Sequence, residues 1–244
     1  MRLTTDGIVI RESSNIGEAD RFVTLLTRDF GVIRAAARGV RQVKNRNAAA
    51  TQLLCYARLI LYKNHDTYII DTARPERMFF ELREDIETLA LAQYFCELSA
   101  VLAPQEEPAQ EYLRLLLNAL HLLGEKKYDP RQVKAVFELR MLALAGYCPA
   151  LQSCAVCGAQ PEQPVLLPRR GVLCCAACRP EPGARALTPA VLAAMRHIVS
   201  APAERCFAFR LPAPQVALLA AVCEEYLLER LGRTFKTLEF FHSL

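Results

Sequence analysis

The sequence predicts an α+β fold, in which a small β-barrel precedes an α-helical domain that carries an inserted cysteine-rich module. Two observations lead to this prediction. The first 80 residues hold five short runs rich in β-branched and aromatic residues. From residue 81 onward apolar residues recur at helical spacing, until a segment rich in Cys, Pro and Gly interrupts the pattern. The expected ranges are a barrel at 1–80, a helical domain in two parts at 81–147 and 187–244, and the module at 148–186.

Polar or glycine-containing turns separate the five predicted strands, which are GIVIR, RFVTLLT, VIRAAARG, CYARLILY and TYIIDTA. Asp29 and Gly31 supply turn chemistry between the second and third runs, which predicts a hairpin. No helix-length pattern is present that would cover a parallel sheet. The spacing therefore favours a small antiparallel barrel, with the five-stranded OB fold as the natural candidate.

The helical patterns end where helix-stopping residues occur. Acidic residues suit the first turn of the first pattern, and Pro104 ends it. Gly124, Gly146 and Gly232 follow later patterns, at positions where helices commonly stop. The expected helices lie at about 82–102, 108–123, 131–146, 189–200 and 213–231.

Composition and charge narrow the class of protein. At 244 residues and 52% hydrophobic content, the chain is long enough to bury a core. No stretch approaches the roughly 18 apolar residues of a membrane span, and no apolar signal region follows Met1, so we expect a cytoplasmic protein without membrane contact. Residues 1–80 hold thirteen Lys and Arg against eight Asp and Glu, which points to an anionic partner of the first segment.

Two cysteine pairs have the spacing of a four-thiolate zinc site: Cys154-x2-Cys157 and Cys175-x2-Cys178. The loop between the pairs has few apolar residues to bury, so a metal ion is needed to hold it. Cys174 is an alternative to Cys175 as a ligand, although two-residue spacing favours Cys175. The remaining cysteines stand singly among apolar residues, which is typical of reduced core thiols.

The predicted zinc site is structural rather than catalytic. No histidine lies between His121 and His197, and Glu162 is the only acid in the long loop of the module. A catalytic zinc keeps an open position and has such groups nearby. Deaminase, Ser-His-Asp, P-loop and dinucleotide-binding patterns are also absent from the sequence, and the lack of a nucleotide-hydrolysing motif disfavours a motor or a recombinase core.

A basic stretch, RAAARGVRQVKNR, leaves the predicted third strand and enters the connection to the fourth. This is a rim position that OB barrels use to meet nucleic-acid backbones, and such contacts are charge-driven and salt-sensitive. A solvated basic loop is the alternative. Arg169 and Arg170, in the cysteine-rich module, are further candidates. The candidate DNA contacts are therefore Arg34, Arg38, Arg41, Lys44, Arg46, Arg169 and Arg170.

These motifs, taken in order, resemble the RecO family of bacterial DNA repair and recombination mediators. The order is TDGIVIR, GEADRFVTLLTRDFGVIRAAARGVR, a helical region, the two cysteine pairs and a terminal RTFKTLEFF, and it agrees nearly end to end. The most specific parts are Gly17-Glu18-x-Asp20-Arg21 with Thr24-Leu25-Leu26-Thr27, Ala-Arg-Gly at 37–39 followed by Arg41, and Lys236-x-Leu238.

The resemblance implies an N-terminal OB fold, a helical domain and a zinc module in a non-enzymatic protein. It implies binding of single- and double-stranded DNA and annealing of complementary strands. It further implies action with RecR, which helps RecA load on DNA coated by the single-strand-binding protein, and hence association with the nucleoid during repair.

In one respect the sequence departs from the family pattern. The family typically has Gly-x-x-Cys-x-x-Cys at the second cysteine pair, whereas here Gly171 is followed by Val-Leu-Cys174-Cys175-Ala-Ala-Cys178. Cys174 therefore holds the position expected from the glycine, and the two-residue pair is shifted by one. The ligand at this position stays open between Cys174 and Cys175.

A second hypothesis of a different class is a zinc-ribbon protein-interaction factor, whose OB-type barrel binds protein and lacks intrinsic affinity for single-stranded DNA. It predicts that zinc removal abolishes partner binding. A metal-dependent hydrolase is a third hypothesis, disfavoured by the lack of acid and base groups around the cysteines.

Overall fold

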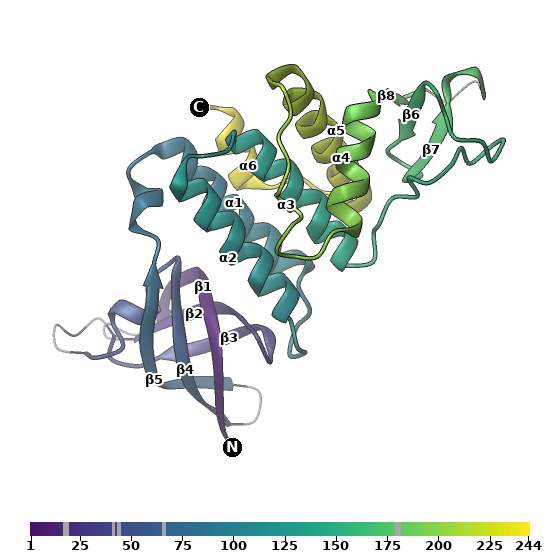
Figure 1. The fold of residues 1–244 in the computed structure, drawn as a ribbon. Coiled ribbons are helices and arrows are strands. Elements are labelled where there is room, and N and C mark those ends of the chain that lie inside the picture. Colours follow the sequence, from purple (N-terminus) through teal and green to yellow (C-terminus); the bar gives the residue numbers. More distant parts are fainter. Residues whose placement is uncertain (17–19, 41, 43–44, 65–66, 179–181) are drawn as a thin grey trace. The chain divides into compact units, whose positions relative to one another are not determined.

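The computed structural model describes residues 1–244 except 17–19, 41, 43–44, 65–66 and 179–181 (Figure 1). The described chain forms two compact units. The first contains residues 1–124 and 237–244, and the second contains residues 125–236. No helix in the described part of the chain is long and apolar enough to cross a membrane. The predicted boundaries at 80, 147 and 186 stay a prediction.

The first unit begins with a closed five-stranded barrel in the order β1-β2-β3-β5-β4, which confirms the predicted fold class (Figure 1). Neighbouring strands are antiparallel except β3 and β5, which pair in parallel. The expectation of a wholly antiparallel barrel is therefore wrong at this pair. An odd number of strands cannot alternate in direction around a closed ring, so one pair must run parallel. The strands are β1 (Arg2–Ile16), β2 (Asp20–Thr27), β3 (Gly31–Ala37), β4 (Cys55–Asn64) and β5 (Thr67–Met78).

Alternate residues along the strands fill the barrel, as the two-residue period of a strand requires. Val23 and Leu25 of β2 face Ile33, Ala35 and neighbouring side chains of the interior. The predicted hairpin between β2 and β3 is confirmed, with Thr27 paired to Gly31. A left-handed backbone at Gly31, with φ of 56°, closes this turn.

Helices complete the first unit. The η2 turn (Phe80–Arg83) leads into α1 (Ile86–Leu102), which is followed by α2 (Gln110–Glu125). The Asp85 side chain accepts a hydrogen bond from the Thr88 backbone N–H, which caps α1. A short helix, α6 (Lys236–His242), returns to this unit, where the Thr237 hydroxyl donates to a Glu97 carboxylate oxygen at 2.6 Å.

The second unit packs α3 (Pro130–Leu144) against α4 (Pro189–Ser200) and α5 (Ala213–Leu231). Asp129 and Thr188 cap the starts of α3 and α4, and Gly232 ends α5 in a left-handed conformation. Between α3 and α4 lies a three-stranded sheet that the sequence analysis does not predict. It has the order β7-β6-β8, formed by β6 (Pro164–Leu167), β7 (Val172–Cys175) and β8 (Arg185–Ala186).

A buried ionic network joins α3 to α5. The Lys134 ammonium lies 2.8 Å from a Glu138 carboxylate oxygen and 2.5 Å from a Glu224 carboxylate oxygen. Burial lowers the pKa of Lys134, but the two carboxylates outweigh it and raise the pKa above its ordinary value. Because the folded-state pKa is raised, this stabilisation is complete below the ordinary pKa of 10.5 and is lost as pH rises through the folded-state value.

Replacing the buried cation tests this network. We expect Lys134→Met to lower the free energy of unfolding by about 3–5 kcal/mol at pH 7, because it leaves buried carboxylates without their counter-charge. Urea denaturation measures this loss. The double variant Lys134→Met/Glu138→Leu should recover part of it, since it removes one of the stranded carboxylates. Equal losses in both variants would show that packing, not charge, makes Lys134 important.

Candidate metal centre and nucleic-acid interface

The two predicted cysteine pairs come together in the module. Their four Sγ atoms all lie within 4.8 Å of one another. The Cys154 and Cys178 sulfurs are 3.8 Å apart, and the Cys157 and Cys175 sulfurs are 3.7 Å apart. Tetrahedral Zn–S bonds of about 2.3 Å would place the sulfurs about 3.8 Å from one another. The four cysteines can therefore hold a metal ion without rearrangement of these two pairs.

Backbone hydrogen bonds stabilise the thiolate form of Cys154, one of the four cysteines. Hydrogen bonds from the backbone N–H groups of Cys157, Val156 and Cys175 lower the pKa of Cys154 to about 6, despite its burial. Burial and hydrogen bonds with neighbouring sulfurs raise the pKa of Cys175 to about 12. A hydrogen bond with Cys157, together with burial, raises the pKa of Cys178 to about 11. Four thiolates repel one another, and a divalent cation at their centre would remove that repulsion, so the donor set fits a thiolate-binding metal.

Cys174 lies outside this group of four sulfurs. It is buried and packs with Leu167 and Cys154, whereas Cys175, the next residue on β7, reaches the cluster. Successive residues of a strand point to opposite faces, so only one of the two can do so. The structure therefore brings Cys175 to the cluster, and its role as a ligand stays a proposal.

Gly171 is needed for the turn between β6 and β7. It does not determine which of the following cysteines reaches the cluster. Its φ is +64°, and a Cβ atom at this position would lie 2.4 Å from an Arg230 guanidinium nitrogen. A glycine is required there whichever cysteine follows. The glycine-based family spacing therefore does not select Cys174.

Two arginines hold the module on the helices of the second unit. Arg196 of α4 donates to the carbonyl oxygens of Leu151 and Gln152, at 2.8 and 3.0 Å. Arg230 of α5 donates to the carbonyl oxygens of Arg169 and Arg170 in the β6–β7 turn, at 3.4 and 2.8 Å. Each arginine replaces hydrogen bonds that loop carbonyls would otherwise make with water.

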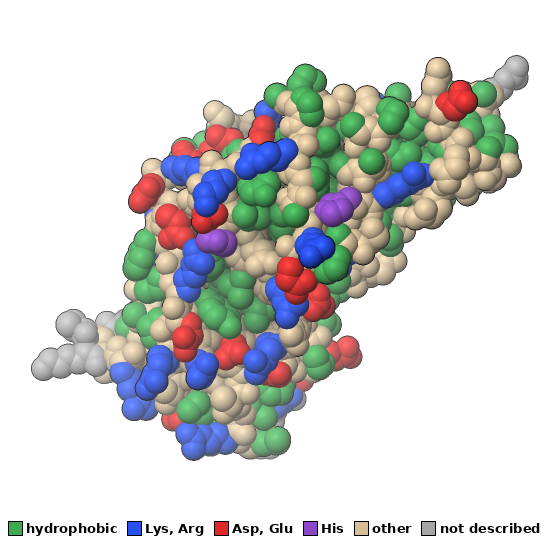
Figure 2. All heavy atoms as spheres, in the orientation of Figure 1, with side chains coloured by type: hydrophobic (Ala, Val, Ile, Leu, Met, Phe, Trp, Pro, Cys, Tyr) green, Lys and Arg blue, Asp and Glu red, His purple; other side chains and the backbone are tan. Residues whose placement is uncertain are grey.

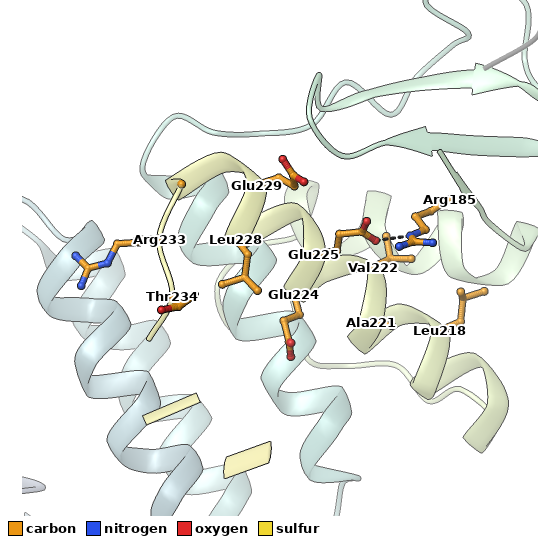
Figure 3. A pocket seen from close by; sticks show the side chains of 11 residues that line it. Arg185, Leu218, Ala221, Val222, Glu224, Glu225, Leu228, Glu229, Arg233 and Thr234 are labelled. Atoms are coloured by element: carbon orange, nitrogen blue, oxygen red, sulfur yellow. Dashed lines mark hydrogen bonds and ion pairs between the residues drawn. The ribbon is translucent and has the colours of Figure 1, made fainter. Parts of the chain in front are cut away.

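Ion pairs on α5 add to this attachment. Figure 3 shows Arg185 of β8 reaching Glu225 across a hollow of about 860 Å³ that α5 lines. The acids of this hollow are all paired, in the combinations Glu225–Arg185, Glu224–Lys134 and Glu229–Arg169. The positive charge of Arg169 is thus locally compensated, and DNA contact by Arg169 and Arg170 stays a prediction.

Substituting single cysteines tests the metal centre. We expect Cys154→Ser and Cys175→Ser to lose stoichiometric metal and to lower the melting temperature, because three sulfurs cannot close a tetrahedral site. Cys174→Ala is the matched control and should keep one metal ion per chain. Metal content after dialysis, measured by mass spectrometry, checks both. Full metal content in Cys154→Ser, or its loss in Cys174→Ala, would contradict this assignment.

A row of directly paired residues crosses the outer face of the barrel. Ser13 pairs with Phe22, Phe22 with Ala36, Ala36 with Ile69, and Ile69 with Tyr62. We call these five residues the outer row. Its two aromatic residues, Phe22 and Tyr62, are separated by three strand-to-strand steps, which is roughly 14 Å along the sheet. Small and aliphatic side chains between them leave an apolar strip that a chain of bases can cross.

Cations flank the outer row. The Arg34 guanidinium stacks on the Phe22 ring, 4.3 Å from its centroid. Arg38 and Arg46 are exposed and line a hollow of about 590 Å³ next to Tyr62. Among the described residues, the side chains of Arg38 and Arg46 make no ion pair. These guanidinium groups are therefore available to an anionic ligand.

The hollow, called the barrel hollow below, is lined by Arg38, Arg46, Tyr62, Ile69, Ile70, Asp71 and three asparagines. Lys and Arg side chains also gather over the barrel on the face drawn in Figure 2. Tyr62 has 44% of its surface exposed, whereas Tyr68 is buried in the barrel interior. Of these two tyrosines, only Tyr62 presents its ring to the outside.

The connection that carries Arg38 and Arg46 is tied down at both ends. The Asp20 carboxylate accepts a hydrogen bond from the Gly39 backbone N–H at 2.7 Å, where Gly39 has a left-handed φ of 63°. Asn45 donates to the Arg38 carbonyl oxygen at 3.1 Å. Asp20 and Gly39 belong to two separate motifs singled out in the sequence, and the structure brings these motifs together.

The far end of the connection is joined to an irregularity in β5. Ile70 pairs with Leu61 and Thr72 pairs with Ile60, so Asp71 is the extra residue of a β-bulge. The buried Asn47 side chain donates to the Asp71 carbonyl oxygen at 3.1 Å and accepts from the Ala73 N–H at 3.0 Å. It thereby supplies ladder bonds that the bulge removes, and it holds the connection against the barrel.

The sequence predicts part of this face. Arg34, Arg38 and Arg46 lie on it, whereas Arg41 and Lys44 fall outside the described residues. The sequence does not indicate Asn47 or Asp71 as part of this face. Asn47 bonds across the bulge at Asp71, and that bulge is defined only by the pairing of β5 with β4, so no local pattern marks either residue. The exposure of Tyr62 also depends on which face of β4 closes the barrel.

The fold and these sites define an OB-fold protein with an exposed aromatic and cationic face and a separate four-cysteine centre. Residues 1–79 match the family model "Recombination protein O N terminal", and residues 83–239 match "Recombination protein O C terminal". The chain therefore belongs to the RecO family of DNA repair proteins.

Individual relatives agree with this assignment. The chain is 32% identical over 244 residues to "DNA repair protein RecO" of Acetivibrio thermocellus, covering 99% of this chain and 97% of that protein. It is 36% identical over 247 residues to the RecO protein of Symbiobacterium thermophilum, covering 98% and 96%. It is also 34% identical over 242 residues to that of Desulforudis audaxviator.

Proposed function

We propose that this protein is a non-enzymatic recombination mediator that binds single- and double-stranded DNA through its barrel. One observation carries the proposal: the outer row places Phe22 and Tyr62 on a continuous strip, with Arg34, Arg38 and Arg46 beside it. Aromatic platforms combined with a cationic groove are how OB folds hold single strands. Double-stranded DNA would use the same cations through its phosphates.

The wider mediator role rests on family membership. Annealing of complementary strands, action with RecR, and help to RecA in loading on DNA coated by the single-strand-binding protein are functions that the family resemblance implies. They agree with a face that holds a strand mainly by its backbone and by stacking, so that base edges outside the barrel hollow stay free to pair. A protein acting there would work in the cytoplasm, at the nucleoid.

We also propose that the four-cysteine centre holds a structural Zn²⁺ ion. When bound, zinc would neutralise the thiolates and staple the two cysteine turns together. Among the described residues, no histidine or carboxylate belongs to this cluster. The chain's own residues then do the remaining work: Arg196 and Arg230 fix the module on α4 and α5.

The salt dependence of DNA binding tests the barrel face. We expect Arg38→Gln and Arg46→Gln each to reduce the slope of log affinity against log salt by about 0.7 for single-stranded DNA, because each removes one phosphate contact. Arg205→Gln in the second unit removes the same charge and is the matched control. Fluorescence anisotropy with a labelled oligonucleotide across a salt series measures the slopes.

Replacing Phe22 should give a different result in the same assay. Phe22→Leu should weaken binding at every salt concentration and leave the slope unchanged, because stacking releases no counterions. Slopes that fall equally in Arg38→Gln and Arg205→Gln would mean that overall charge, rather than this face, binds DNA.

Removal of the metal separates the mediator from the protein-interaction alternative. We expect Cys154→Ser protein to keep its affinity for single-stranded oligonucleotides, because the cysteines and the outer row belong to different units. Strand annealing without nucleotide cofactor should be kept as well. A zinc-ribbon interaction factor would instead show negligible affinity for single-stranded DNA with or without metal, and that result would favour the alternative.

A further inference from the structure

The barrel hollow contains a feature that phosphate binding does not explain. Asp71 lines it together with Arg38 and Arg46, and it is the only acid among the described residues that do so. A carboxylate repels phosphate, so a hollow built only for the DNA backbone gains nothing from it. A carboxylate does accept hydrogen bonds from amino groups on the edges of bases.

Strand alternation places this acid on the outer side, because Asp71 directly follows Ile70, which faces the barrel interior. The bulge at Asp71 then lets Ala73 face the interior again. Among the described residues, its carboxylate accepts one hydrogen bond, from the Thr72 hydroxyl at 3.4 Å. Among the described residues neither Arg38 nor Arg46 forms an ion pair with it. The acid is therefore held in position by backbone bonds and keeps acceptor capacity for a ligand.

The other walls suit a flat heterocycle. The exposed Tyr62 ring is directly paired with Ile69, and both line the hollow. The volume of about 590 Å³ lies within the usual range for small-ligand sites, roughly 300–1,000 Å³. A base stacked on Tyr62 would have the two arginines near its phosphate and Asp71 near its edge.

We propose that the barrel hollow binds one unstacked base of single-stranded DNA and that Asp71 selects bases with an exocyclic amino group. This inference rests on the proposed DNA-binding function of the barrel. Cytosine offers its N4 amino group to the carboxylate. Thymine offers only a ring N–H between two carbonyl oxygens, whose partial negative charges face the carboxylate. The barrel therefore discriminates between two pyrimidines of similar size.

The test compares short labelled oligomers of deoxycytidine, deoxythymidine and deoxyuridine at pH 8, by anisotropy with the full-length protein. We expect the cytidine oligomer to bind roughly three- to tenfold more tightly than the other two, as one charge-assisted hydrogen bond would give. Deoxyuridine lacks the methyl group of thymidine. Its weak binding would show that the amino group, rather than a clash with the methyl group, makes the difference.

Asp71→Asn should bring the affinities for cytidine and thymidine oligomers together, because an amide both donates and accepts. Glu76→Gln is the matched control. Glu76 is the extra residue of a second bulge in β5, between the Tyr56–Arg77 and Ala57–Pro75 pairs, and it does not line the hollow. This control removes the same charge and should keep the cytidine preference.

Different failures have different meanings. Equal binding of the three oligomers by the unaltered protein would overturn the base-selection proposal and leave the DNA-binding function standing. A cytidine preference that survives in Asp71→Asn would also overturn it, because some other group would then select the base. Absence of binding to every oligomer at low salt would overturn the proposed function itself, and the inference with it.

Discussion

Closing a barrel with an odd number of strands forces one neighbouring pair to run parallel, and the candidate interface depends on that pair. The parallel contact of β3 with β5 puts Ala36 next to Ile69. It thereby joins two antiparallel parts of the sheet into one outer row from Phe22 to Tyr62. The chain leaving β3 must then get past β5 to reach β4, and Asn47 of this connection is hydrogen-bonded to Asp71 and Ala73 of β5. That route carries Arg38 and Arg46 to the edge of the row.

The same route requires compensation for lost backbone hydrogen bonds. Curvature in the long strand β5 is taken up at bulges, and a bulge removes bonds from the ladder. Asn47 replaces them with its own amide, while Asp20 holds the beginning of the connection at Gly39. Buried polar groups of this kind are stabilising only when all their partners are present. The residues that hold the connection on the barrel therefore also determine where its cations lie.

The cysteine module follows a different principle. Its short strands bury only a small cluster around Leu167, Cys154 and Cys174, so side-chain hydrogen bonds and ion pairs add to its stability. Four cysteine sulfurs are brought together, and a metal ion would stabilise their thiolate forms. Arg230 of α5 and Arg196 of α4 donate hydrogen bonds to loop carbonyl oxygens of the module. The outer row and the four-cysteine centre thus belong to separate units with separate sources of stability.

The sequence by itself determined the fold class, the hairpin at Gly31, the helices α1 to α5 and the cysteine pairs, because strand period, helix period, turn residues and ligand spacing are local properties. Short strands such as β6 and β7 escaped prediction, since four residues carry too little periodicity, although the glycine turn between PVLL and VLCC marks a hairpin. Only the tertiary structure decided between Cys174 and Cys175 as the sulfur that reaches the cluster, and which tyrosine is exposed. It also decided that Asp71 lies in a hollow with Arg38. These outcomes depend on which face of a strand is buried and on where a ladder is interrupted, and both are set by partners distant in the chain.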